Sequence, residues 1–107
     1  MEIVRDADQI CRKLSRFMAG SRKIALIGVG NLLRKDDGVG INILRKLRDR
    51  IGDKDQIIFI ESHTTPENYF SFLEREKPSC ILFIDAADAQ LPPGTVFLAD
   101  LDQVEEL

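Results

Sequence analysis

The sequence has little of what a disulfide scaffold, a zinc module or a membrane protein needs. Its 107 residues include two cysteines, one histidine and no tryptophan. Cys11 and Cys80 form no CxxC pair, and the first 20 residues lack the apolar stretch of an export signal. We therefore interpret both as reduced thiols in a cytoplasmic protein and expect no cysteine-based zinc site. No run approaches the roughly 20 apolar residues of a membrane span.

The charge balance is also modest. The formal net charge is −3, with 44% hydrophobic and 31% charged residues, which is the composition of an ordinary globular protein. We expect neither nucleic acid nor membrane as a partner, because a chain of this charge has no general attraction to polyanions. The length suits one domain over residues 1–107.

Hydrophobic spacing predicts alternating helices and strands. Helical spacing marks a helical extension within 1–20 and further helices over 39–52 and 64–77, while continuous apolar runs mark buried strands over 23–30, 56–62 and 79–88. The sequence then predicts a turn at 92–94, a fourth strand over 95–100 and the start of a helix at 102–107. This order predicts an α/β protein with an α-β-α layered arrangement and a mostly parallel, twisted sheet.

Parallel strands would bring their carboxyl ends to one edge of that sheet. The segments "GVGN" (28–31), "ESHTT" (61–65) and "DAAD" (85–88) each stand where a predicted strand ends. Folds of this class place their functional sites at this edge, so we expect the three segments to form the site.

The loop "GVGNLLRKDDGVG" (28–40) has two possible interpretations. It begins like a dinucleotide-binding loop, with Glu61 as the acid for a ribose, but Leu33 replaces the third glycine. Asp36 and Asp37 would also repel a pyrophosphate, by roughly 1–4 kcal/mol per charge pair at about 4 Å. We therefore reject nucleotide binding as the first interpretation.

The alternative occupant is a cation. Asp36 and Asp37 stand before a helix, and Asp85 and Asp88 follow the third strand, so carboxylates from two strand ends would converge. Helix capping by Asp36 and Asp37, and turn formation by Asp85 and Asp88, explain the same residues without a ligand. The pattern by itself leaves both explanations open.

Four ordered segments resemble a known family. "GVGNLLRKDDGVG", "TTPEN", "ILFIDAAD" and "PPGTVFLAD", within residues 23–102, are similar to the nickel–iron hydrogenase maturation endopeptidases. The resemblance implies a phosphorylase/hydrolase-like fold and an enzyme that cuts a C-terminal extension from the hydrogenase large-subunit precursor. It also implies that the nickel in that precursor is the recognition handle.

The resemblance also implies roles for individual residues. Asp37 and Asp85 match the metal-binding and catalytic acids, and the matching loop positions are Gly30, Asn31, Asp36, Gly38 and Gly40. The histidine of the family lies downstream of Leu107, so we expect a protease-like core over 23–107 that lacks a C-terminal strand and helices. His63 is a possible substitute ligand; the alternative is a surface histidine without that role.

Several functional alternatives stay open at this stage. Nickel either polarises the scissile bond, or only docks the precursor while Asp37 serves as general base. A module that binds the nickel-loaded precursor without cutting it is a second possibility, and a nucleotide-binding half-domain a third. We expect the cluster Arg45, Lys46, Arg48 and Arg50 to be a solvated helix face, with contact to an acidic partner as the alternative.

Overall fold

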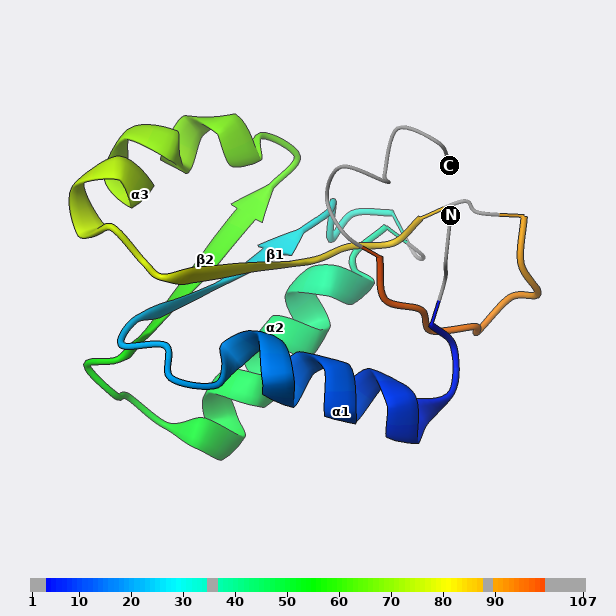
Figure 1. Cartoon of the computed structure of the whole chain (residues 1–107). Helices are drawn as coiled ribbons and strands as arrows, with labels where there is room; N and C mark the ends of the chain where they lie inside the picture. The colour runs from blue at the N-terminus through cyan, green and yellow to red at the C-terminus, as the bar shows by residue number, and fades with distance from the viewer. Residues whose placement is uncertain (1–3, 35–36, 88–89, 100–107) are drawn as a thin grey trace. The chain divides into compact units, whose positions relative to one another are not determined.

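A computed structural model describes residues 4–34, 37–87 and 90–99 of the chain. The chain divides into two compact units, one of residues 20–86 and one of residues 1–19 with 87–107. The elements in chain order are α1 (Ala7–Met18), β1 (Ile24–Val29), α2 (Val39–Ile51), β2 (Ile57–His63), a 3-10 turn η1 (Pro66–Tyr69), α3 (Phe70–Glu76) and β3 (Cys80–Ile84). Figure 1 shows their course.

The strands of residues 20–86 form a parallel sheet in the order β2-β1-β3. Ile27 at the centre of β1 pairs with Ile60 of β2 and Phe83 of β3. The four residues 25–28 in the middle of β1 are buried, because β1 has a strand on each side and a helix on each face. The prediction of a parallel α/β sheet from continuous apolar runs is confirmed.

The two helices of this unit lie on opposite faces of the sheet, as Figure 1 shows. On one face, α2 buries Ile41 and Leu44. On the other face, Leu73 of α3 belongs to a core cluster with Ala25, Ile27 and Ile60. The predicted α-β-α layering is therefore confirmed, and this layering fixes the carboxyl ends of the three strands at one edge.

The predicted helix over 64–77 is present in two parts. Thr65 occupies the position before η1 and Pro66 its first position, but the Thr65 hydroxyl accepts a hydrogen bond from the Asn68 side chain (3.0 Å) instead of capping the backbone. The chain turns more tightly over 66–69 and becomes α-helical from Phe70. Short 3-10 turns are common at helix starts, and periodicity alone does not distinguish them.

The predicted fourth strand over 95–100 is wrong for residues 95–99. Leu98 forms only an isolated antiparallel bridge with Val4, with Leu98 N–H donating to Val4 O at 2.9 Å. The predicted turn at 92–94 is confirmed: Thr95 N–H donates to Pro92 O at 3.1 Å, and Gly94 has a φ of 85°. Asp100 and the helix predicted at 102–107 lie outside the described residues.

Helix α1 is amphipathic, as its spacing predicts, and begins with a side-chain cap. The Asp6 carboxylate accepts a hydrogen bond from Gln9 N–H at 3.1 Å. Ile10, Leu14 and Met18 on its apolar side are half-buried, and none of its side chains is fully buried. Across the described ranges, no helix has both the length and the apolar character required to cross a membrane.

Candidate functional site at the carboxyl edge of the sheet

The loop after β1 closes on itself through Asp37. Asn31 N–H donates both to the backbone oxygen of Asp37 (3.0 Å) and to its Oδ2 (3.1 Å). Gly30 has a φ of 145°, and a Cβ there would overlap the Asp37 carbonyl oxygen, so only glycine fits. The Asn31 side chain accepts from Leu33 N–H at 2.9 Å and stabilises the turn that follows. These contacts hold the Asp37 carboxylate close to the end of β1.

Asp37 is not the cap of α2. The residue at the cap position is Gly38, and it provides no side-chain hydrogen bond to the helix. The capping explanation that the sequence left open for Asp37 is therefore wrong, because its carboxylate is bonded backwards to Asn31. The other candidate cap, Asp36, lies outside the described residues.

Two glycines let the start of α2 reach the ends of the strands. A Cβ on Gly40 would overlap Ile84 O and lie 2.5 Å from Val29 O. A Cβ on Gly28 would meet Gly40 O at 3.0 Å. The first turn of α2 is thus in backbone contact with the last residues of β1 and β3, and no larger residue than glycine allows this approach.

Asp85 follows Ile84 at this point and interacts electrostatically with Asp37. Asp85 is exposed, but partial loss of hydration raises the pKa of its carboxyl above its usual value. A backbone hydrogen bond from Ala86 lowers this pKa, and the negative charge of Asp37 raises it further. The structure therefore brings together the two acids that the sequence placed at the ends of different elements.

His63, the other candidate ligand among the described residues, forms no metal-binding group with this pair. His63 ends β2 with a φ of 54°; its side chain is exposed and its carbonyl accepts from Gly30 N–H at 2.7 Å. No group of three or more His, Cys, Asp or Glu side chains is arranged for a metal within residues 4–34, 37–87 and 90–99. Asp88 lies outside those ranges. Within the described ranges, His63 therefore forms no three-residue group with Asp37 and Asp85.

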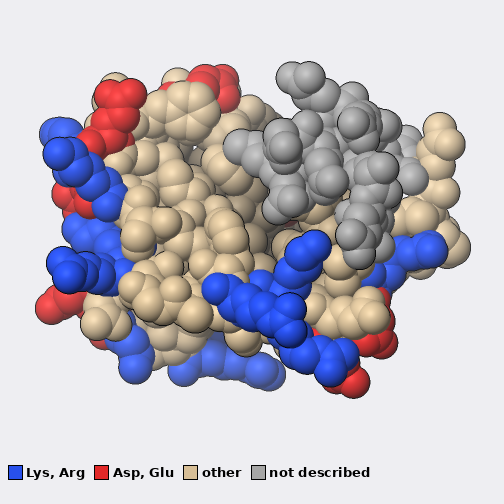
Figure 2. Space-filling view, viewed as in Figure 1, with Lys and Arg blue, Asp and Glu red and all other residues tan. Residues whose placement is uncertain are grey.

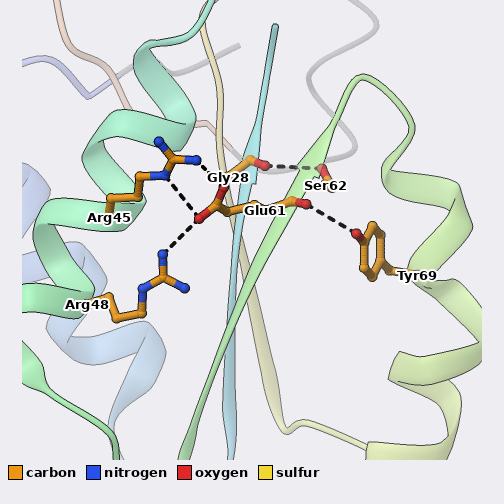
Figure 3. A network of polar contacts seen from close by, with 6 residues as sticks. All are labelled: Gly28, Arg45, Arg48, Glu61, Ser62 and Tyr69. Carbon is orange, nitrogen blue, oxygen red and sulfur yellow. Dashed lines mark hydrogen bonds and ion pairs between the residues drawn. The ribbon is translucent and has the colours of Figure 1, made fainter. Parts of the chain in front are cut away.

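Glu61 belongs to a different arrangement. Figure 3 shows it between two arginines of α2. Arg45 donates Nε and Nη2 to the carboxylate (3.1 and 2.7 Å), and Arg48 donates Nη2 at 2.8 Å. The hydrogen bond from Arg45 is the largest cause that lowers the pKa of Glu61 from 4.5 to about 2. Burial opposes this effect, and the hydrogen bond from Arg48 and the charges of both arginines lower the pKa further. The ribose-binding role considered for Glu61 does not account for this double ion pair.

The same pairing corrects the interpretation of the basic cluster on α2. Arg45 and Arg48 bind Glu61, whereas Lys46 and Arg50 are exposed. The sequence did contain a signal for this contact. Glu61 and its neighbour Ile60 point to opposite faces of the strand, and the two arginines stand three positions apart on one side of the helix.

Two further hydrogen bonds fix the end of β2, and sequence reasoning missed both. The buried Ser62 hydroxyl donates to Gly28 O at 3.2 Å, and the Tyr69 hydroxyl donates to Glu61 O at 3.2 Å from the opposite face (Figure 3). Neither residue is part of a recognisable motif. These bonds join β2 to β1 and to η1 beside the carboxyl edge.

Comparison with known proteins identifies relatives of this chain. The chain is 32% identical over 89 residues to a Methanocaldococcus jannaschii protein assigned as a hydrogenase maturation protease; the match covers 78% of this chain and 53% of the relative. It is 30% identical over 82 residues to the hydrogenase 3 maturation protease of Escherichia coli K12, covering 77% and 51%. The chain is a relative of the hydrogenase maturation proteases. The resemblance inferred from the four segments is confirmed.

The solved structure of a NiFe hydrogenase maturation protease, HycI from Thermococcus kodakarensis, has a similar fold. The TM-score is 0.69 at 24% identity, covering 75% of this chain and 51% of HycI. The chain thus spans about half the length of the maturation proteases that it matches. No profile of a protein family matches it.

Proposed function

We propose that the chain carries the precursor-recognising part of an endopeptidase that removes the C-terminal extension of a nickel–iron hydrogenase large-subunit precursor after nickel insertion. Asp37 and Asp85 are the residues that meet the nickel of the precursor. In this proposal the metal arrives with the substrate and is its recognition handle. The observation that carries the proposal is the convergence of these two carboxylates at the carboxyl edge of the sheet.

The chemistry of the pair suits a cation. A positive ion reduces the repulsion between two neighbouring carboxylates. Carboxylate oxygens are also compatible with nickel as ligands. Asn31 N–H holds one oxygen of Asp37, Oδ2, and leaves Oδ1 without a hydrogen bond within the described residues. Asp37 therefore offers one oriented oxygen and one available oxygen.

The same carboxylates provide a route to hydrolysis. An ionised carboxylate next to the scissile bond accepts a proton from the attacking water, which is the role of a general base. Asp37 is our candidate for this role, because its backbone and side chain are both fixed by Asn31. In this scheme Asp85 helps to position the precursor through its nickel.

A second candidate function is binding without cleavage. The described residues contain no group of three possible metal ligands, and the chain spans about half the length of its relatives. Two carboxylates suffice to contact a metal that the precursor already holds. A module of this kind would retain the nickel-loaded precursor and leave its tail intact.

Mass spectrometry of precursor mixed with purified chain separates these functions. We expect nickel-loaded precursor to lose the mass of its extension, and nickel-free precursor to stay intact. Asp37→Asn and Asp85→Asn should abolish this loss, whereas Asp49→Asn, an exposed acid on α2, should keep it. Co-elution without cleavage would overturn the endopeptidase in favour of the binder. If neither cleavage nor co-elution is observed, both proposed functions are overturned.

A further inference from the structure

Helix α1 carries a second polar feature that the site above does not use. Gln9, Arg12, Lys13 and Arg16 follow the spacing i, i+3, i+4 and i+7, so they form one stripe along the helix. We refer to these four residues as the α1 basic stripe. It lies on the side of α1 opposite the apolar stripe that contains Leu14.

The side chains of the α1 basic stripe surround a hollow. The four residues and Val4 line a shallow cavity of about 330 Å³. Figure 2 shows Lys and Arg side chains gathered over α1. Cations that line one concavity repel each other unless an anion lies between them, so this arrangement favours a negatively charged occupant.

The chain supplies no counter-ion to the stripe within the described ranges. The ion pairs formed there involve Lys23, Arg45 and Arg48, and none involves Arg12, Lys13 or Arg16. The nearest acids on α1 do not compensate, because Asp6 caps Gln9 N–H and Asp8 forms no ion pair with Arg12. Among the described residues, no acid neutralises these three cations.

We propose that the α1 basic stripe is a docking surface for a short acidic segment of a partner protein. The stripe is about 10 Å long at 1.5 Å per residue, which fits a few consecutive Asp or Glu side chains. Arginine pairs with carboxylates in a bidentate manner. Phe17, 57% exposed and one helical turn after Lys13, provides an aromatic contact beside the charges.

The surroundings favour a protein segment over the other anionic macromolecules. A nucleic acid running along the helix would meet Asp6 and Asp8 at the N-terminal end, and the whole chain has a net charge of −3. A membrane-surface helix needs its apolar side free for the lipid. Ile10, Leu14 and Met18 on that side are half-buried and not fully exposed.

Fluorescence anisotropy of the full chain with labelled polyglutamate tests the proposal. We expect saturable binding that weakens as salt rises, and at least about tenfold weaker binding when Arg12, Lys13 and Arg16 are all replaced by glutamate. The matched control replaces Lys46, Arg50 and Lys54, three exposed cations elsewhere, by glutamate, and should bind as the wild type does. Circular dichroism checks that each variant is folded.

The controls make the outcome decisive. An equal loss in the matched control would mean that total charge matters and not α1, which overturns the proposal. Tighter binding of single-stranded oligonucleotide or of anionic phosphatidylserine vesicles than of polyglutamate would also overturn it. If the glutamate variant unfolds, the triple glutamine variant replaces it, and wild-type affinity in that variant contradicts the docking surface. This test involves neither Asp37 nor Asp85, so it stands apart from the peptidase proposal.

Discussion

Replacing Glu61 by glutamine keeps the size of the side chain but removes the charge that both arginines of α2 bind. The pKa of Glu61 is lowered from 4.5 to about 2, and at about 1.4 kcal/mol per pKa unit this gives an upper bound of about 3.5 kcal/mol. Solvent reduces this value, because Arg45 and Arg48 are 46% and 38% exposed and Glu61 is 22% exposed. Exposed pairs contribute about 0.2–1 kcal/mol each. We therefore expect Glu61→Gln to lose about 1–2 kcal/mol of unfolding free energy at pH 7.

The pH dependence gives the sharper test. A carboxylate whose pKa is lowered by folding stabilises the protein above its unfolded pKa, and this stabilisation is lost as pH falls from near 4.5 towards 2. The difference between wild type and Glu61→Gln should therefore be full at pH 6–7 and decline below about pH 4.5. It should also shrink in high salt, because the arginines are accessible.

Thermal unfolding followed by circular dichroism measures this difference. We expect a decrease in Tm of about 5–10 °C at pH 7 for a chain of this size. Glu74→Gln, an exposed glutamate on α3 outside the ion pairs of the described residues, is the matched control and should change Tm little. If Glu61→Gln and Glu74→Gln unfold alike, or if the loss is the same at pH 7 and pH 3, the double ion pair does not hold α2 to β2 as we describe.

Two other predictions follow from the packing. Gly40→Ala should lower the unfolding free energy by about 1–2 kcal/mol, because overlap of the new Cβ with Ile84 O outweighs the gain in helix propensity. Asn42→Ala, at an exposed position two residues further along α2, should not lower it. Equal Tm values for the two variants would contradict the close helix–strand contact. In a thiol titration of the native protein, exposed Cys11 should react quickly, whereas buried Cys80 should react only on unfolding. Burial limits access to the Cys80 thiol and raises its pKa. Fast reaction of both thiols would show that the sheet does not protect Cys80.

Local periodicity was sufficient for most of the fold. The apolar runs at β1, β2 and β3 and the helical spacing of α1 and α2 are each readable within a few residues, because burial on one face or two imposes a fixed repeat. The parallel arrangement then places Asp37 and Asp85 at the same edge. The strand predicted over 95–99 was wrong, because a short apolar run forms a strand only where a neighbouring strand accepts its hydrogen bonds.

The sequence by itself determined the order of elements, the edge of the sheet at which the candidate site lies and the two acids proposed for it. Tertiary structure alone decided which partners the polar side chains near this edge bind. Asp37 turns to Asn31 instead of capping α2, and Glu61 binds two arginines instead of standing at the edge as a free ligand. The reason is that a repeat along the chain records which side of an element is buried, whereas a polar side chain takes its partner from whatever distant segment the packing brings within hydrogen-bonding distance.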